Sequence, residues 1–535
     1  MKRILMVLAA LVLTASMAAA QGTIKIGGIW TLADITGKQG SAAAQLAVDE
    51  INAAGGVNGK KLELIVVDDE GKADKAAAAV EKLATVDKVE VFIGGMASGA
   101  ELGKIPAFKK YGKVVMSTGA AGSATVEKAL GPSPESDFYF HLHPWDYNQG
   151  ASYAEGWDAI QKKYPKIQIK KIFLAYEEGA FGKSSWDATK VLFGQDKRYV
   201  VDGMSFKSAL LGGGDYTAVL EAAKSFKPDL FLWAGYDADA LPLLEQSKAM
   251  KFSPGIYLGA PPGWPIGFGS SRLAGNVMLY GMWSTAMNEN NPVSKKFYDG
   301  YVKKTREEPA TYFAPLAYSA VYVLAEGIRK AGTTETAPLV KALEATNYFS
   351  PLGETITFKP SNIIKHQGIT RQKILQWQAG FQEVIWPFEA ATAEPVIPGP
   401  RRAFSRPGGQ NYQKGSQMAL KHRTAILAAS GLAVGIAVLL WKPTVLIYGL
   451  QAAGLYAAIA IPMGLVLGIV HIVNLAHGDF MMVAAYATYF ACKALGMDPL
   501  LAILPTALVT ALFGWIVFQF TTLYSWPWRS STLWD

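Results

Sequence analysis

Apolar and polar positions in the first half of the chain follow two alternating patterns. Short apolar runs suited to buried strands are each followed by a stretch with the roughly three-to-four-residue spacing of an amphipathic helix. The expected strands are residues 24–29, 62–67, 91–94, 114–117, 172–175, 199–206 and 230–233, and the expected helices include 42–53, 73–85 and 150–164. Strands that alternate with helices predict an α/β fold with parallel sheets covered by helices on both faces.

The alternation forms two series and therefore predicts two lobes. From Asn276 to Tyr348 the pattern is mainly helical, and strands are expected again at 355–358 and 373–377. We therefore expect the chain to return to the first lobe and then to the second. The expected lobes are about 23–140 with 272–350, and about 141–271 with 351–390. Open α/β sheets bind ligands beyond the carboxyl ends of their strands, which predicts a cleft between the lobes.

The N-terminal residues 1–20 have the pattern of a secretory signal peptide. Lys2 and Arg3 precede the apolar run Ile4–Leu13, and three alanines at 18–20 provide a cleavage pattern. We expect the signal to be removed and residues 21–395 to reside in the periplasm. An uncleaved membrane anchor is the alternative.

The composition changes after the second lobe. Residues 391–423 are rich in Pro, Gly and Arg and are interpreted as a linker. Beyond it lie four apolar runs, at 424–441, 445–470, 481–495 and 500–520. Each is close to the length that crosses a bilayer. Residues 424–535 are therefore predicted to form about four transmembrane helices in the inner membrane.

The charge of the chain is unevenly distributed. Of its 535 residues half are hydrophobic, and the formal net charge is +8. Residues 4–395 carry 40 basic and 40 acidic side chains, whereas residues 396–535 carry nine basic and three acidic ones. The sequence pI near 9.1 is therefore no argument for nucleic-acid binding. The single cysteine, Cys492, excludes an intramolecular disulfide.

The stretch Val91–Ala100 combines a predicted strand end with a predicted helix start. Val91–Gly94 lead into Gly95, and a helical pattern begins near Glu101. The free N–H groups of a helix start favour an anion, and the Ser98 hydroxyl lies beside them. Ser98 is therefore either a ligand contact or simply the N-cap of the helix.

Particular motifs resemble a known family of receptors. Residues 23–390 resemble the periplasmic leucine/isoleucine/valine-binding protein family through the motifs at Ile51–Lys60, Asp68-Asp69 and Phe92–Gly94. The resemblance implies a type I fold, with two doubly wound parallel sheets on either side of a cleft. It also implies an extracytoplasmic receptor of an ABC importer, which binds a small amino acid or a related carboxylate or amide.

A second resemblance covers residues 445–515, which are similar to the start of a branched-chain amino acid ABC permease. It rests on Gly464–Phe480 and Phe513–Trp515 and is expected to end near Phe520. Together the two resemblances imply a receptor fused to a truncated permease, which would need further permease subunits and a separate ATPase as partners.

The receptor family also implies which residues contact the ligand. Its serine after the third strand, which holds the ligand carboxylate together with nearby amides, matches Ser98. Its threonine in the loop after the fourth strand is replaced by Ala121, with Ser123 as a possible substitute. The implied contacts are Trp30, Ala97, Ser98, Gly119, Ala120, Ala121, Phe181, Tyr236 and Pro261. Trp30, after the first strand, is either an apolar wall of the site or simply part of the core.

One implied contact departs from the family pattern. The glutamate that pairs with the ligand ammonium falls near Pro261, where no acid stands. A buried ammonium needs a charge partner or several acceptors. Asp237 or Asp239 either replaces the glutamate or caps a helix. The sequence thus favours a ligand without an ammonium group, such as an aromatic acid or an amide.

Other functional classes find little support. Gly179–Ser184 resembles a P-loop ending, but two residues separate its glycines where about four are required. His141 and His143 are either half of a metal site or part of a strand with alternating exposure. No enzyme motif with proper spacing appears, and no cofactor or nucleic acid is expected. A membrane-anchored periplasmic sensor of the same fold is the alternative to transport.

The segment between the receptor-like and permease-like parts of the chain has an unusual distribution of basic residues. Arg401, Arg402, Arg406, Lys414, Lys421 and Arg423 precede the first apolar run, and only Lys442 follows it closely. Basic residues favour the cytoplasmic side of a span, so an exported receptor would enter it in the disfavoured orientation. We hypothesise that two adjacent reading frames, a receptor and a permease, are joined here.

Overall fold

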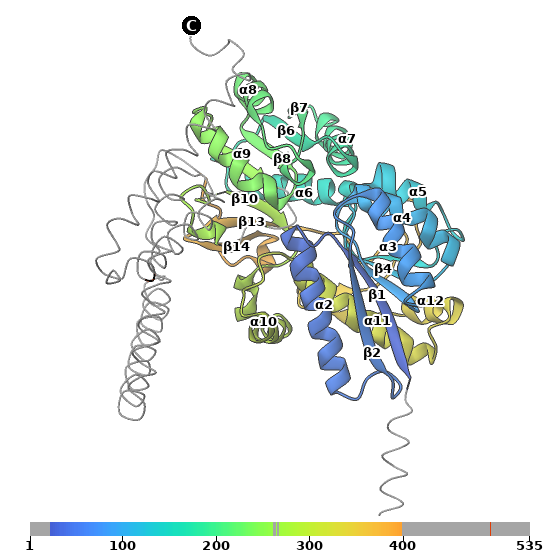
Figure 1. The fold of residues 1–535 in the computed structure, drawn as a ribbon. Helices are drawn as coiled ribbons and strands as arrows, with labels where there is room; N and C mark the ends of the chain where they lie inside the picture. The colour runs from blue at the N-terminus through green and yellow to red at the C-terminus, as the bar shows by residue number, and fades with distance from the viewer. Residues whose placement is uncertain (1–21, 260–263, 265–266, 276, 398–492, 494–535) are drawn as a thin grey trace, which may run out of the picture. The chain divides into compact units, whose positions relative to one another are not determined.

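A computed structural model describes residues 22–259, 264, 267–275, 277–397 and 493 (Figure 1). Among these residues, no helix combines the length and the apolar character that a membrane crossing requires. The signal segment 1–20, most of the linker and, apart from residue 493, the four expected spans lie outside the described residues.

Lobe 1 is built on a five-stranded parallel sheet in the order β2-β1-β3-β4-β5. Its strands are β1 (Thr23–Trp30), β2 (Lys61–Asp68), β3 (Val91–Gly94), β4 (Val115–Ser117) and β5 (Tyr139–His141). Its helices are α2 (Ile35–Ala53), α3 (Ala73–Thr85), α4 (Ser98–Tyr111), η1 (Ser123–Glu127) and α5 (Lys128–Leu130), joined from later in the chain by α11 (Phe313–Ala331) and α12 (Thr336–Glu344). The predicted strands are confirmed here to within a residue or two.

The two faces of the lobe 1 sheet pack against different helices. Successive side chains of a strand point to opposite faces. Val91 and Ile93 accordingly belong to the core that includes residues of α2 and α11, whereas Phe92 belongs to the core formed with α3 and α4. Figure 1 shows α2 on one side of β1 and β2, and α3 and α4 on the other. The continuous apolar pattern of β3 follows from this burial on both faces.

Lobe 2 is built on a seven-stranded sheet in the order β14-β13-β10-β9-β8-β6-β7. Its strands are β6 (Lys171–Glu177), β7 (Val200–Phe206), β8 (Leu230–Ala234), β9 (Ile256–Gly259), β10 (Met278–Gly281), β13 (Lys373–Gln378) and β14 (Phe381–Trp386). Its helices are α6 (Asp146–Lys163), α7 (Ala180–Gly194), α8 (Thr217–Phe226) and α9 (Asp237–Ala249), with short turns η2 (Ala209–Leu211) and η3 (Phe268–Ser270).

The second sheet differs from the expectation in three respects. β10 pairs with β9 and β13, so residues near 278 belong to lobe 2, whereas the chain was expected to return to lobe 1 from about 272. β9 and β14 were not among the expected strands, and neither was β5 of lobe 1. Because β13 and β14 form an antiparallel hairpin next to β10, the sheet is mixed and not wholly parallel. The four-residue run of β10 was hidden inside a mainly helical pattern.

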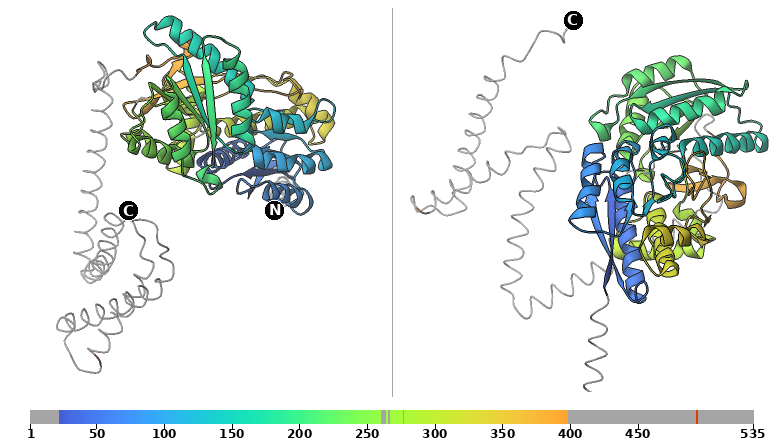
Figure 2. Two further views of the ribbon diagram at one scale, coloured as in Figure 1. Left: turned by 90° about the horizontal axis from the view of Figure 1, so that it is seen from above. Right: turned by 90° about the vertical axis from the view of Figure 1, so that its right-hand side faces the viewer.

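The chain crosses between the lobes three times within the described residues. The crossings follow β5, β10 and α12, and the last two contain η4 (Thr285–Glu289), α10 (Pro292–Thr305) and the hairpin β11 (Tyr348–Phe349) and β12 (Thr355–Ile356). The short turn η5 (Phe388–Ala390) follows β14. The first and third crossings run side by side, since the His141 amide donates to the His366 carbonyl at 2.9 Å. Figure 2 shows the two lobes from two further directions.

Candidate functional site

Ser98 is the first residue of α4 and does not cap it. The N-cap is Ala97, which makes no side-chain cap, and the buried Ser98 Oγ instead accepts a hydrogen bond from the Gly122 amide at 3.1 Å. The capping interpretation of Ser98 is therefore wrong. The hydroxyl holds the loop after β4 against the start of α4.

That loop carries three of the implied contacts, Gly119, Ala120 and Ala121. A side chain at Gly119 would lie 2.6 Å from the Gly95 carbonyl oxygen, so only glycine fits there. Ala120 has a φ of +69°, which L-residues with a side chain adopt rarely, and its amide donates to the Met96 carbonyl at 3.0 Å. Such strain is typical of backbone that is shaped for a site.

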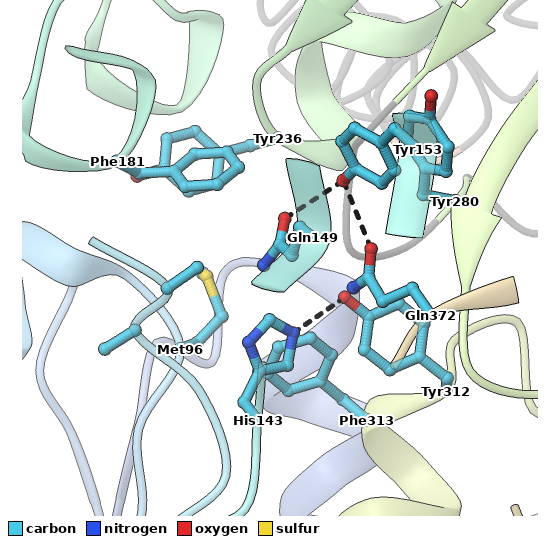
Figure 3. A pocket seen from close by; sticks show the side chains of 12 residues that line it. Met96, His143, Gln149, Tyr153, Phe181, Tyr236, Tyr280, Tyr312, Phe313 and Gln372 are labelled. Atoms are coloured by element: carbon cyan, nitrogen blue, oxygen red, sulfur yellow. Dashed lines mark hydrogen bonds between the residues drawn. The ribbon is translucent and has the colours of Figure 1, made fainter. Parts of the chain in front are cut away.

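A pocket lies between the loop of lobe 1 and the elements of lobe 2, and it holds about 390 Å³ of empty space, its mouth included (Figure 3). It is lined by Met96, Ala120, Ala121, His143, Gln149, Tyr153, Phe181, Tyr236, Tyr280, Tyr312, Phe313 and Gln372. Four of the implied contacts are among these residues: Ala120, Ala121, Phe181 and Tyr236.

The other implied contacts are not in this wall. Trp30 is fully buried in the core that includes residues of α2 and α11. Ala97, Ser98 and Gly119 lie in or next to the turns that carry the pocket residues Met96 and Ala120. Pro261 lies outside the described residues.

Hydrogen bonds connect the polar side chains of the pocket (Figure 3). The Tyr153 hydroxyl lies 3.1 Å from both the Gln149 Oε1 and the Gln372 Oε1, and the Tyr312 hydroxyl lies 2.9 Å from the His143 Nε2. Burial lowers the pKa of His143 to about 3, with the nearby His141 as a second cause. The imidazole of His143 is therefore neutral at physiological pH.

Sequence reasoning missed most of the polar pocket residues. His143 and Gln372 come from the first and third crossings, Tyr312 comes at the end of the second, and Gln149 and Tyr153 come from α6. His143 was noted only as part of a pair with His141. No local pattern distinguishes the other four residues from ordinary core positions.

The two acids suggested as substitutes for the missing glutamate have other partners. Asp239 is buried and accepts hydrogen bonds from the Ser208 and Tyr216 hydroxyls at 2.7 and 2.6 Å, and from the Ala209 and Tyr236 amides at 2.8 Å. Its oxygens are thus engaged inside lobe 2. Asp237 Oδ2 lies 3.4 Å from the Ile35 amide of lobe 1 and is not in the pocket wall.

His141 is also engaged, and it is buried together with His143. Its ring nitrogens lie 2.9 Å from the Gln367 Oε1 and 2.7 Å from the Gly119 carbonyl oxygen. The interpretation of the pair as a strand with alternating exposure is therefore wrong. Within the described part of the chain, no group of three or more His, Cys, Asp or Glu side chains is placed to hold a metal ion.

Comparison with known families identifies this architecture. A family model described as periplasmic binding protein matches residues 23–382, about two thirds of the chain. The chain belongs to the periplasmic binding protein family. This is a family of solute-binding transport proteins and not of enzymes. A second model, described as a branched-chain amino acid transport system permease component, matches residues 445–531. That match extends past Phe520, where the resemblance was expected to end.

Individual proteins agree with this assignment. Leu/Ile/Val-binding protein homolog 7 of Brucella abortus is 23% identical over 414 residues, which cover 74% of this chain and 100% of that protein. LivJ from Streptococcus pneumoniae is a branched-chain amino acid transporter substrate binding protein whose structure was solved with isoleucine. Its sequence is 25% identical to this chain, and the two structures superpose with a TM-score of 0.56. The superposition covers 70% of this chain and 100% of LivJ.

A third relative shares the fold at lower identity. The solute binding protein of an R. palustris ABC transporter, solved in complex with benzoate, is 18% identical with a TM-score of 0.58 and covers 70% of this chain and 98% of its own. The described part of this chain therefore has the type I periplasmic binding protein fold.

Proposed function

We propose that this receptor binds a small aromatic carboxylate or carboxamide that carries no ammonium group. One observation carries the proposal: the described pocket wall contains six Tyr or Phe rings, one neutral histidine and two amide side chains, but no Asp, Glu, Lys or Arg. Stacked rings favour a flat apolar ligand. Amide and imidazole groups supply a few polar contacts, as is common in small-molecule pockets.

The same wall disfavours leucine and its relatives. A buried ammonium without a charge partner loses several kcal/mol of hydration. The family glutamate is absent, Asp239 is saturated by four hydrogen bonds, and Asp237 is not in the described wall. The N-terminus of α4, whose first amides lack partners inside the helix, supports the binding of a negative or carbonyl oxygen instead.

Relatives show what the fold can accommodate. The LivJ structure contains isoleucine, and the R. palustris protein of the same fold contains benzoate. The fold therefore accepts both ligand classes, and the side chains of the pocket decide between them. Here we infer that the receptor delivers its ligand to a permease of the branched-chain amino acid type and that a separate ATPase drives import. The match of residues 445–531 supports this inference.

Titration calorimetry on the purified receptor part, residues 22–397, tests the proposed ligand class. Benzoate and benzamide present an oxygen acceptor on a ring, benzylammonium presents a cation on the same ring, and leucine is the amino-acid probe. We expect benzoate or benzamide to bind at least about tenfold more tightly than either ammonium compound, a difference of about 1.4 kcal/mol. Micromolar or tighter binding of leucine, with no binding of the aromatic probes, would contradict the proposal.

A further inference from the structure

We propose that His143 selects the ligand by donating a hydrogen bond from its Nδ1 to a carbonyl or carboxylate oxygen. This inference rests on the proposed function and names the polar group that recognises the ligand oxygen in that pocket. It assigns a role to a residue that neither the receptor motifs nor the pattern of the chain indicated.

Among the described side chains of the pocket wall, only His143 has a buried nitrogen or oxygen atom without a hydrogen-bond partner. The side chain is only 3% exposed, yet Nδ1 has no hydrogen-bond partner. The Pro144 carbonyl lies near enough to the ring to oppose the fall in the pKa of His143, but it does not meet hydrogen-bond geometry with Nδ1 and it accepts instead from the Gln149 Nε2 at 3.0 Å. A buried N–H without a partner is costly, about 1–3 kcal/mol, so a free donor in a pocket wall indicates that a ligand completes it.

Neighbouring side chains determine which nitrogen carries the proton. The Tyr153 hydroxyl lies 3.1 Å from both the Gln149 Oε1 and the Gln372 Oε1. Gln372 also hydrogen-bonds Tyr312, and because this bond acts to lower the pKa of the phenol, the Gln372 amide nitrogen is its donor. Since Gln372 offers Tyr312 a donor and not an acceptor, the Tyr312 proton needs another acceptor, and the His143 Nε2 lies 2.9 Å away. With Nε2 accepting, a neutral imidazole has its hydrogen on Nδ1.

Electrostatics keep the donor uncharged. Burial lowers the pKa of His143 to about 3, and the neighbouring imidazole of His141 has its ring centroid 6.4 Å away and a pKa that is also lowered by burial. From the start of α11, His143 faces the phenol of Tyr312 (Figure 3), whose pKa burial raises. A neutral N–H donor favours an oxygen acceptor and offers nothing to an ammonium group.

The hydrogen-bonded side chains of His143, Tyr312 and Gln372 also connect the three crossings between the lobes. His143 lies in the first crossing, Tyr312 at the end of the second and Gln372 at the end of the third. The hydrogen is therefore held on the His143 Nδ1 only when all three crossing segments are in this arrangement. Ligand selection and the relative position of the lobes are thus coupled through one chain of hydrogen bonds.

Calorimetry with benzoate and benzamide on three variants of residues 22–397 tests the donor. His143→Phe removes both ring nitrogens and should weaken binding about tenfold to a hundredfold. His143→Asn retains an N–H near the Nδ1 position and should recover part of this loss. Tyr312→Phe leaves His143 in place but removes the group that fixes its tautomer, and it should lose several-fold in affinity. His366→Phe, a buried histidine outside the pocket wall, is the matched control and should keep wild-type affinity.

Two readouts separate this role from a structural one. The affinity ratio of wild type to His143→Asn for benzamide should stay constant between about pH 5.5 and 8.5, whereas a charged donor would lose its advantage near the ordinary histidine pKa of about 6.5. Wild-type affinity in folded His143→Phe, or in Tyr312→Phe if the first variant does not fold, overturns the inference alone. A wild type that binds neither aromatic probe overturns the proposed function and the inference together.

Discussion

At the scale of single residues, the partner of a side chain decides its role. Ser98 stands where the family has its ligand-binding serine, but its hydroxyl accepts from the Gly122 amide within lobe 1. Ala120, whose amide donates to the Met96 carbonyl, is positioned by the same loop. Ser98 therefore supports the shape of the pocket wall whether or not it also reaches the ligand.

Ser98→Ala should lower the free energy of unfolding of the ligand-free receptor by about 1–3 kcal/mol, because it leaves the Gly122 amide buried without an acceptor. Urea denaturation of residues 22–397 measures this loss. Ser41→Ala is the control, since the Ser41 hydroxyl donates to the Lys38 carbonyl in its own helix and is partly exposed. Equal stability of the Ser98 and Ser41 variants would show that the Gly122 contact is unimportant.

At the scale of elements, two helix starts meet across the lobes. Asp34 caps α2 by accepting from the Thr36 amide at 2.8 Å, and Asp237 at the start of α9 reaches the Ile35 amide at 3.4 Å. Each negative carboxylate is stabilised by the partial positive charge at the N-terminus of its helix. The two carboxylates also repel each other. Burial first, and then the hydrogen bond and charge of Asp237, raise the pKa of Asp34 well above its usual value.

This arrangement predicts a dependence of stability on pH. Since the folded state binds the Asp34 proton more tightly than the unfolded chain does, the free energy of unfolding should fall as pH rises above about 4. Asp34→Asn preserves a good N-cap and should be more stable than wild type near pH 7, with a flatter pH profile. Urea denaturation between about pH 4 and 8 measures both effects.

Asp237→Asn is the matched variant, because it removes the same repulsion without changing the cap of α2. It should also flatten the profile. A wild-type profile that Asp34→Asn and Asp237→Asn leave unchanged would rule out the interlobe pair as its source.

At the scale of the whole molecule, the chain contains two parts with separate family matches. The periplasmic binding protein model ends at residue 382 and the permease model begins at 445. Between them lie the six basic residues that make the orientation of the first apolar run unfavourable for an exported receptor. These features motivate the hypothesis of two joined reading frames.

Expression of the full chain with a tag after Asp535, followed by blotting of membrane and periplasmic fractions, tests this hypothesis. We expect a free soluble receptor and a separate tagged membrane product. The receptor should be detected with an antibody against residues 22–397, since it would lack the tag. One stable full-length membrane band, with the receptor part open to external protease, would refute two separate products.

The sequence alone determined the features that depend on local patterning. The strand-helix alternation predicted two α/β lobes, and α3 at Ala73–Thr85 matches its predicted bounds because its apolar face and its flanking turns are continuous in the chain. Motif order pointed to the receptor family, and the missing acid near Pro261 indicated an unusual ligand. Ala120, Ala121, Phe181 and Tyr236 were found through the family, and they lie in the pocket wall.

Only the tertiary structure decided what surrounds the pocket. β10 has a pattern of only four residues, and it is a strand because β9 and the much later β13 pair with it on either side. β14 is the second arm of a hairpin whose first arm, β13, is placed by that pairing with β10. His143, Tyr312 and Gln372 stand more than 50 residues apart in the sequence, and their convergence requires all three lobe crossings. Side chains that act together through hydrogen bonds leave no periodic signal, because their geometry depends on packing between distant segments and not on spacing along the chain.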